Sequence, residues 1–408
     1  TTLQIEAYKF YGITPSNSLK TAQSLYLAGL ISYPRTSSQK LPNSIDYKKI
    51  LDILKKKYKV SEFITKTKPI EGKKTDPAHP SIYPTGNFQV LSGDDQKIYD
   101  LIAKRFLSLF CDDAIIDNKK ITANVGNLSF VARGSEIKKK AWMDIYPSKL
   151  KENLIPDVNG KVKIIDSRVE EKETQPPKRY SQASIISQLE KKNLGTKATR
   201  SSILETLYDR GYIKEKSIEA TPLGISLIET LEKFSPIIID EKLTRKFEQQ
   251  MNSITESKDN KKEKLIAKEN KIIDDAKETI TKIAKDFEKN ENEIGKNLLN
   301  ANEKLRTQQK KENTLNICPK CKKGNLTITY SKKTRRNFVA CDAYPECKTT
   351  FSLPPNGIIK KTEKICEKCG FPKLQRFSKG KRPWEFCFNP NCPTNAEWAN
   401  KKKNKDIN

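Results

Sequence analysis

The chain has 408 residues, of which 78 are Lys or Arg and 50 are Asp or Glu, so its formal net charge is +28. The length allows about two to four domains with cores of their own, and the charged fraction of 31% keeps much of the chain in solvent. The positive charge favours a polyanionic partner, first of all nucleic acid, because cations that face phosphates release counterions. The sequence has no run of about 18 apolar residues and no opening signal peptide, so we expect a cytoplasmic protein with no membrane partner.

A tyrosine and an arginine flank a proline in the polar turn Gly29 to Pro42, which follows two helices predicted within residues 3–31. Pro34 fixes its own φ and biases Tyr33 toward extended geometry, so the side chains of Tyr33 and Arg35 can reach one site. Tyrosine can act as a covalent nucleophile when a nearby cation stabilises the phenolate or the negative charge that the phenolate transfers during attack. An isolated pattern of this kind is more often an ordinary surface turn, so both interpretations stay open on these residues alone.

His79 is the only histidine in the chain and follows a polar loop at residues 65–77. A lone histidine is usually structural or exposed, but in a rigid, proline-rich segment it can also contact a phosphate or relay a proton. Two further helices are predicted around this loop, an amphipathic one at 45–58 and one at 92–110 that begins with acidic side chains.

Beyond these helices the apolar period changes toward two, which predicts strands. Three are expected, at residues 121–125, 128–132 and 161–165, with turns at Gly126 and Gly160.

A pair of predicted helices at 180–189 and 199–210 has the build of a winged-helix or helix-turn-helix unit and follows a charged linker at 170–179. The second helix begins with basic and hydroxyl side chains beside free backbone N–H groups, which either cap the helix or bind a phosphate. This cluster consists of Lys197, Thr199, Arg200 and Ser201.

Residues 261–300 predict a long charged helix with an apolar residue at every seventh position, as in Ile266, Ile273 and Ile280. We expect this narrow stripe to pack while the other faces stay solvated, which is more often a structural role than a functional one.

Eight of the nine cysteines lie in two similar groups after residue 317, whereas Cys111 is assigned to the core of the N-terminal helices. Each group opens with a Cys-x-x-Cys pair that supplies two corners of a tetrahedral metal site, and a second pair completes a Cys₄ site. In a cytosolic chain this spacing favours two structural Zn²⁺ ions over disulfides, and four thiolates leave no position for a catalytic water. The predicted ligands are Cys318, Cys321, Cys341 and Cys347 in one zinc ribbon and Cys366, Cys369, Cys387 and Cys392 in the other.

Basic and aromatic residues alternate between these cysteines, along short strands predicted at 326–330, 337–340 and 384–387. Stacking rings and cations hold single-stranded DNA without sequence preference, although some of these rings are expected to form the ribbon cores instead. The set comprises Tyr330, Lys332, Lys333, Arg335, Arg336, Phe338, Arg376, Phe377, Lys379, Lys381, Arg382, Trp384 and Phe386, followed by a basic tail at 401–408.

Three blocks, in the same order along the chain, resemble type IA DNA topoisomerases in the archaeal topoisomerase I style. They are residues 25–38, residues 76–85 and residues 194–200. In that family a tyrosine attacks a phosphodiester of single-stranded DNA, stays joined to the 5′ phosphate, and lets another strand pass before the backbone is resealed. The resemblance therefore implies an isomerase that relaxes negatively supercoiled duplex DNA without ATP.

The same resemblance assigns roles to individual residues. It implies that Tyr33 is the nucleophile, that Arg35 binds the scissile phosphate, and that His79 is the active-site histidine. The DNA contacts that go with these three residues are Thr36, Ser37, Lys197, Thr199, Arg200 and Ser201.

The family also binds Mg²⁺ through an acidic cluster in an N-terminal domain called Toprim. This chain opens on Thr1 in a segment that resembles the middle of the family, so we expect it to lack that domain. The aspartate pairs at 94–95, 112–113 and 274–275 lie in helix or turn contexts and do not replace the cluster. The chain alone is therefore expected to be poorly active or inactive, with a Toprim-containing half as its partner in trans or in a precursor.

We thus expect a nucleoid-associated, mixed α/β multidomain protein, mainly helical in its first and third parts.

Two alternative functions remain. In these, the chain is either a non-catalytic zinc-ribbon protein that binds single-stranded nucleic acid, or half of a reverse gyrase. Nucleotide hydrolysis by this chain is excluded because no Gly-x-x-x-x-Gly-Lys loop occurs, and relaxase-type nucleases are excluded because they need a pair of histidines on a metal. The expected parts are a tyrosine domain at 1–114, a partial β arch at 115–175, a winged-helix-like domain at 176–258, a long helix at 259–313, zinc ribbons at 314–357 and 362–400, and the tail.

Overall fold

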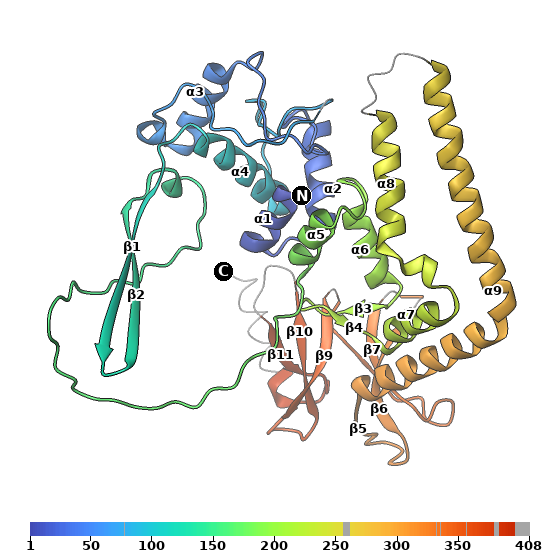
Figure 1. Cartoon of the computed structure of the whole chain (residues 1–408). Helices are drawn as coiled ribbons and strands as arrows, with labels where there is room; N and C mark the ends of the chain where they lie inside the picture. The colour runs from blue at the N-terminus through green and yellow to red at the C-terminus, as the bar shows by residue number, and fades with distance from the viewer. Residues whose placement is uncertain are drawn as a thin grey trace. The chain divides into compact units, whose positions relative to one another are not determined.

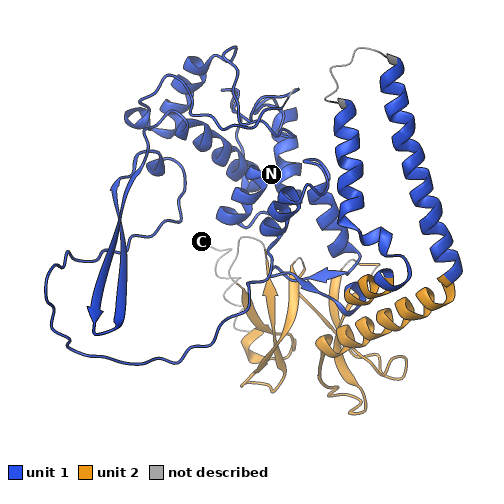
Figure 2. Cartoon of the chain, in the orientation of Figure 1, with its two compact units in different colours: residues 1–224, 231–289 blue, residues 225–230, 290–408 orange. Residues whose placement is uncertain are grey.

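The computed structural model describes residues 1–76, 78–255, 262–331, 333–334, 336–355, 357–378 and 383–395. The described chain is mixed α and β, as predicted, and it divides into two compact units. Unit 1 comprises residues 1–224 and 231–289, and unit 2 comprises residues 225–230 and 290–408 (Figure 2). No helix among the described residues combines the length and the apolar character needed to cross a bilayer.

Unit 1 begins with four helices around one hydrophobic core, at the positions that the sequence predicts (Figure 1). Gly12 ends the first helix with φ of 65°, a left-handed conformation that suits glycine, and Thr14 caps the second by accepting from the Asn17 backbone N–H. Cys111 is fully buried in this core, as expected. The helices are α1 (Thr2–Tyr11), α2 (Pro15–Leu27), α3 (Tyr47–Tyr58) and α4 (Gly93–Ser108), with the short 3₁₀ helix η1 (Ser61–Phe63) after α3.

A two-stranded antiparallel hairpin of β1 (Ile115–Val125) and β2 (Leu128–Lys139) follows, and the 3₁₀ helix η2 (Ala141–Asp144) comes after it. The third strand expected at 161–165 is wrong, because these residues form no strand and Ile165 is 95% exposed. Alternating apolar residues form a strand only when a neighbouring edge accepts their backbone hydrogen bonds. Apart from its pairing with β1, β2 has one further backbone pairing among the described residues, the isolated bridge between Ser135 and Asn153.

The winged-helix-like part has the two predicted helices and, after them, a short two-stranded wing. Ser181 begins the first helix with a capping box that it shares with Ser184. The elements are α5 (Gln182–Lys191), α6 (Arg200–Asp209), β3 (Ile213–Lys214) and β4 (Glu219–Ala220), followed by α7 (Pro222–Phe234), η3 (Pro236–Ile239) and α8 (Glu241–Thr255).

The long helix α9 (Lys262–Asn313) has 52 residues, so it continues past the stripe at 261–300 to residue 313, where the part expected at 259–313 ends. The heptad stripe packs less closely than expected, because Ile266, Ile273 and Ile280 are 43–65% exposed. Buried positions on α9 come later, at Ile294 and Ala301.

In unit 2 the two predicted ribbons share one hydrophobic core. The rings of Phe351, Phe371 and Phe388 meet edge to face, with centroids 5.4–5.7 Å apart. The sequence predicts two separate ribbons, and it does not reveal this joint core. One sheet has the order β5-β6-β7-β8 and the other β11-β10-β9, formed by β5 (Thr314–Ile317), β6 (Asn325–Ser331), β7 (Arg336–Cys341), β8 (Thr350–Ser352), β9 (Ile358–Ile365), β10 (Pro372–Phe377) and β11 (Trp384–Cys387).

Candidate active site and metal centres

Two extended segments of unit 1, residues 29–40 and 72–87, lie side by side and carry the tyrosine and histidine of interest. The Ser32 N–H donates to the Tyr83 carbonyl at 2.9 Å, and the Thr85 N–H donates to the Leu30 carbonyl at 3.0 Å. These backbone bonds fix the chain on the amino-terminal side of Tyr33, directly after α2.

The ring of Tyr33 packs edge to face against the ring of His79, with centroids 4.6 Å apart and an interplanar angle of 72°. A second phenol, Tyr26 of α2, meets Tyr33 in the same manner at 5.2 Å. Tyr33 and His79 are half-buried. The structure thus brings together two residues that are 46 positions apart in the sequence, and it adds Tyr26, for which helical spacing predicted only a position on the apolar face of α2.

The residues that follow Tyr33 point to different partners. Arg35 is exposed, and its guanidinium makes no ion pair with any residue that the structure describes. The Thr36 hydroxyl donates to the His79 carbonyl at 3.3 Å, and the Ser37 hydroxyl donates to an Asp76 carboxylate oxygen at 3.0 Å. Among Arg35, Thr36 and Ser37, only Arg35 therefore presents a positively charged group that an anionic ligand can bind.

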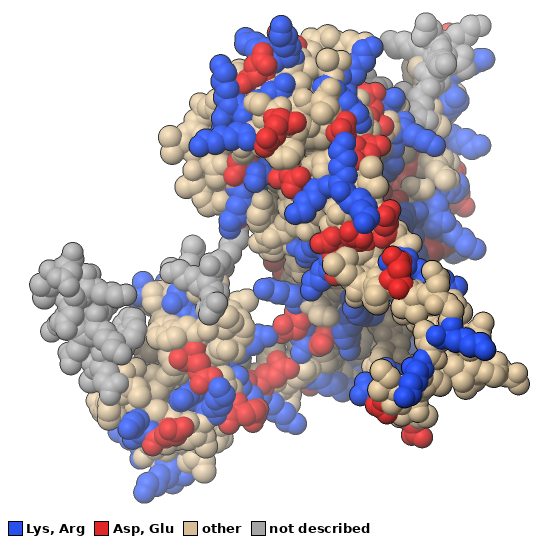
Figure 3. All heavy atoms as spheres, turned by 90° about the vertical axis from the view of Figure 1, so that its left-hand side faces the viewer, with Lys and Arg blue, Asp and Glu red and all other residues tan. Residues whose placement is uncertain are grey.

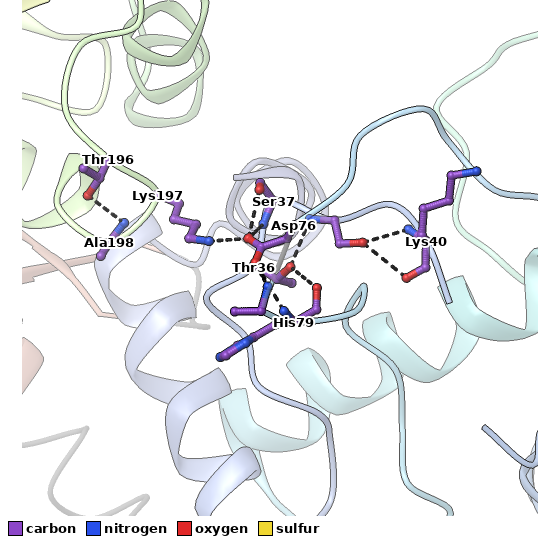
Figure 4. A network of polar contacts seen from close by, with 10 residues as sticks. Thr36, Ser37, Lys40, Asp76, His79, Thr196, Lys197 and Ala198 are labelled. Atoms are coloured by element: carbon purple, nitrogen blue, oxygen red, sulfur yellow. Dashed lines mark hydrogen bonds and ion pairs between the residues drawn. The ribbon is translucent and has the colours of Figure 1, made fainter. Parts of the chain in front are cut away.

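Asp76 is the centre of the polar network in Figure 4. Its side chain is only 2% exposed, and it accepts hydrogen bonds from the backbone N–H groups of Ser37, Ala78 and His79. The ammonium of Lys197 also donates to it. Burial alone would raise the pKa of Asp76, but the hydrogen bonds from Lys197 and Ser37 outweigh this effect and hold the pKa well below its usual range.

The predicted cluster at the start of α6 divides in the structure. Lys197 reaches from the 196–199 loop to Asp76 (Figure 4), whereas the guanidinium of Arg200 donates to the carbonyls of Leu194 and Gly195 at 3.0 and 2.8 Å. The Thr199 hydroxyl accepts from the Thr196 N–H at 2.9 Å. Ser201 is buried, with 4% of its surface exposed. Lys197 therefore joins the candidate site, and Arg200, which hydrogen-bonds the loop, lines the same cavity as Lys197.

A cavity of about 450 Å³ lies beside this network, lined in part by Pro34, Thr36, Ser37 and Lys197. Charge by itself does not locate the site on the face in Figure 3, because Lys and Arg side chains there are interspersed with Asp and Glu.

The first cysteine cluster has the geometry of a tetrahedral zinc site. The sulfurs of Cys318 and Cys347 lie 3.9 Å apart and those of Cys321 and Cys341 3.6 Å apart. A tetrahedron with Zn–S bonds of about 2.3 Å requires sulfurs about 3.8 Å apart, whereas a disulfide requires about 2 Å. The Gly324 N–H donates to Cys321 at 3.4 Å and lowers the pKa of this thiol to about 6, which favours the thiolate that binds metal.

The second cluster repeats this arrangement. The sulfurs of Cys366 and Cys392 are 3.6 Å apart and those of Cys369 and Cys387 are 3.4 Å apart. In each cluster all four sulfurs lie within 4.8 Å of one another. All eight predicted ligands thus form two Cys₄ sets, whose thiolates fit structural Zn²⁺.

Comparison with known proteins bears on both regions. A family model described as DNA topoisomerase matches residues 1–266. The chain belongs to the DNA topoisomerase family. A second model, described as topoisomerase DNA binding C4 zinc finger, matches residues 316–356, which include the first cysteine cluster.

Relatives of this topoisomerase chain include DNA topoisomerase 1 of Pyrococcus horikoshii, 42% identical over 96% of the chain and 57% of the relative. DNA topoisomerase 1 of Methanothermobacter thermautotrophicus is 40% identical over 96% of the chain and 53% of the relative. The chain thus spans about half the length of the curated relatives it matches. The solved structure of full-length topoisomerase I from Thermotoga maritima has the same fold, with a TM-score of 0.55 and 20% identity over 89% of this chain and 57% of that one.

The described residues of this topoisomerase offer no cluster of three or more acidic side chains for a Mg²⁺ ion. Their only groups of three or more metal-capable side chains are the two Cys₄ clusters. Two of the candidate aspartates are engaged elsewhere, since Asp112 pairs with Lys139 at 2.7 Å and Asp275 with Lys246 at 3.1 Å. Asp76, which accepts from the His79 backbone N–H, already pairs with Lys197.

Some expected DNA contacts in the ribbons fall on residues that are not described, namely Lys332, Arg335, Lys379, Lys381, Arg382 and the tail 401–408. Among the rings, Phe386 is buried in the shared core, while Tyr330 and Trp384 are 57% and 37% exposed.

Proposed function

We propose that this chain carries the tyrosine half of a type IA topoisomerase reaction, in which one DNA strand is cleaved, another strand passes and the break is resealed. The observation that carries the proposal is the contact between Tyr33 and His79 in a chain of the DNA topoisomerase family. The reaction relaxes negatively supercoiled DNA and needs no ATP.

In the proposed cleavage step, the phenol oxygen of Tyr33 forms a bond to the phosphorus of a single-stranded DNA backbone. The bond from phosphorus to the 3′ oxygen breaks, the phenol gives up its proton, and the 3′ oxygen gains one. The products are a phosphotyrosine joined to the 5′ end of the downstream fragment and a free 3′ hydroxyl on the upstream fragment. One phosphate ester replaces another of similar energy, so the reverse step reseals the strand without an added energy source.

Arg35 and His79 suit the two needs of this step. The exposed guanidinium of Arg35, two residues after the nucleophile, can bind non-bridging phosphate oxygens through paired N–H groups. The imidazole of His79 packs against the Tyr33 ring, where it is placed to relay a proton of this step.

The proposed substrate is single-stranded DNA at the break and supercoiled duplex as a whole. The cavity beside the Tyr33 loop is about 450 Å³, a volume in the range of small-molecule sites, and could hold a nucleotide next to the reacting phosphate. In unit 2 the exposed rings of Tyr330 and Trp384 offer stacking surfaces for unpaired bases, and the exposed Lys333, three residues after Tyr330, supplies charge. The zinc ions fold these ribbons and take no part in the chemistry.

We further propose that the Mg²⁺-binding carboxylates come from a Toprim-containing partner or from another part of a longer protein. The poor fit of Mg²⁺ to the described residues supports this dependence. No step above relies on the metal.

The test is transfer of label from a 3′-labelled single-stranded oligonucleotide to protein, because the 5′ phosphate of the labelled fragment becomes joined to the tyrosine. The chain is assayed with Mg²⁺, alone and with the part of the Pyrococcus horikoshii relative that it does not match, since the chain covers only 57% of that relative. We expect a labelled adduct with the added part and little or none without it.

Tyr33→Phe should abolish the adduct, while Tyr26→Phe, which alters the neighbouring phenol, should retain it. An adduct that survives Tyr33→Phe and disappears in Tyr26→Phe would reassign the nucleophile. Oligonucleotide binding without any adduct would favour the non-catalytic alternative, and ATP-dependent positive supercoiling by the assembled enzyme would favour the reverse gyrase alternative.

A further inference from the structure

We infer that Asp76 is a positioning residue for this cleavage reaction. Its carboxylate holds the tyrosine loop, the histidine segment and the loop before α6 in one arrangement. The inference rests on the proposed function, because it names the group that sets the geometry of the same site.

The contacts of Asp76 are unusually many for one side chain. One carboxylate oxygen accepts from the Ser37 N–H at 3.1 Å, from the Ser37 hydroxyl at 3.0 Å and from the Lys197 ammonium. The other accepts from the backbone N–H groups of Ala78 and His79 at 3.1 and 3.2 Å. An ionised side chain that is 2% exposed needs such partners, because an unpaired buried charge is strongly unfavourable.

These contacts link segments that are distant in the sequence. Ser37 is 39 residues from Asp76, and Lys197 is 121 residues away. Since Ser37 closely follows the nucleophile and His79 closely follows Asp76, the carboxylate ties together the chain on both sides of the Tyr33–His79 contact. The Thr36 hydroxyl adds a second tie, to the His79 carbonyl at 3.3 Å.

The side chain of His79 shows that Asp76 acts through the backbone. In Figure 4 the imidazole extends away from the carboxylate, and the printed hydrogen bond to Asp76 comes from the His79 backbone N–H. Asp76 therefore places the histidine through its backbone, without a hydrogen bond to its ring.

Lys197 gives the arrangement a measurable signature. An ammonium has three donor hydrogens, so Lys197 can keep Asp76 and still donate to a phosphate. The negative carboxylate, however, weakens the attraction of Lys197 for that phosphate. Removing the charge of Asp76 should therefore leave DNA binding unchanged or slightly tighter while slowing cleavage, a combination that general loss of structure does not produce.

Besides the packing of α1 against α5 and of α2 against α6, two exposed ion pairs link the winged-helix-like part to the tyrosine domain. Lys74 pairs with Glu190 of α5 at 2.7 Å, and Lys20 of α2 pairs with Glu205 of α6 at 3.1 Å. These pairs are more exposed than the Asp76 carboxylate and should contribute little on their own. Loss of the Asp76 contact alone should thus leave the unit folded and disturb the site locally.

The experiment measures two quantities on the assembly that forms the adduct in the label-transfer assay. One is the single-turnover rate of adduct formation at saturating oligonucleotide, and the other is the Kd for the same oligonucleotide. The variants are Asp76→Asn, Lys197→Met and the double variant. Asp113→Asn is the matched control, because Asp113 is a carboxylate that pairs with a lysine at 3.6 Å but is 84% exposed.

We expect Asp76→Asn to slow adduct formation at least about tenfold, as small displacements of reacting groups do, with the Kd unchanged or lowered. Adduct formation by the double variant should be at most about twofold slower than by Asp76→Asn, because both changes break one shared interaction. Asp113→Asn should match the unchanged chain in both quantities.

A rate for Asp76→Asn within about twofold of the unchanged chain would overturn the inference, and so would a loss explained entirely by weaker binding. If thermal unfolding shows that Asp76→Asn is not folded at the assay temperature, Ser37→Ala replaces it, since it removes one donor and leaves the carboxylate paired. Ser37→Ala and Lys197→Met should then each slow the saturated rate, and normal rates in both would overturn the inference.

The two proposals fail in different ways. Adduct formation that depends on Tyr33 but not on Asp76 removes the positioning role and leaves the proposed function standing. No adduct from the unchanged assembly removes the proposed function, and the role of Asp76 falls with it.

Discussion

The ring of Phe351 in β8 meets the ring of Phe371 edge to face, with the centroids 5.7 Å apart, and so joins the two zinc ribbons. Phe371 lies two residues after the ligand Cys369, so the packing of one ribbon supports a metal ligand of the other. We expect Phe371→Ala to lower the free energy of unfolding of unit 2 by about 2 kcal/mol and to weaken zinc retention at the second site. Thermal unfolding and the zinc content after dialysis measure both effects.

Phe130→Ala is the control for this prediction, because Phe130 lies on the β1–β2 hairpin and is 57% exposed. It should leave the zinc content at two ions per chain. If Phe371→Ala retained both ions and the original melting temperature, the ribbons would be independent.

Gly324 allows the first zinc site to close. A Cβ at this position would lie 2.9 Å from the Cys341 sulfur and 2.8 Å from the Ala343 Cβ, both closer than such atoms approach. Gly324→Ala should therefore displace a ligand and lower the bound zinc toward one ion per chain in the presence of a competing chelator. Elemental analysis after gel filtration provides the measurement.

The matched comparison is Gly370→Ala in the second ribbon. Gly370 has φ of 69°, but a Cβ there meets no atom within 4 Å. This variant should lose about 1 kcal/mol of stability from backbone strain and keep both ions. Equal zinc loss in the two variants would show that crowding at Gly324 is not the cause.

The Tyr58 hydroxyl donates to Asp100 at 2.5 Å between α3 and α4. Burial and the Asp100 carboxylate raise the pKa of this phenol far above its usual value. A raised pKa in the folded state means that the stabilisation is fully present below about pH 10, where the unfolded tyrosine is neutral, and is lost as the pH rises further. We expect Tyr58→Phe to be about 1 kcal/mol less stable in urea at pH 8, with a smaller difference at pH values above about 10.

Tyr180→Phe serves as the reference, since Tyr180 is 49% exposed. Its stability should follow that of the unchanged chain at both pH values. A constant difference between Tyr58→Phe and the unchanged chain across this range would contradict the assigned pKa shift.

Local patterns in the sequence predict much of this structure. Helical periodicity located α1 to α6, and the cysteine spacing identified both Cys₄ clusters, because ligands of a zinc knuckle are close in sequence as well as in space. The strand expected at 161–165 failed because strand formation depends on a partner edge, which periodicity does not reveal.

Contacts between residues that are far apart in the chain could not be predicted from the sequence for a similar reason. Asp76 was noted only as part of the block that contains His79, and its partner Lys197 lies 121 residues away. Tyr26 resembled an ordinary apolar position of α2, although its ring contacts Tyr33. The joint core of the ribbons depends on Phe351 and Phe371, which separate ribbon patterns do not connect.

Cys111 gives the protein an internal standard for thiol chemistry. It is fully buried, and burial raises the pKa of its thiol to about 11, so it should stay silent toward alkylating reagents while the fold persists. The other eight cysteines are the predicted metal ligands. A reagent that counts reactive sulfurs should then report none in the zinc-loaded chain, eight after chelation and nine in denaturant, which reads metal occupancy and unfolding in one titration.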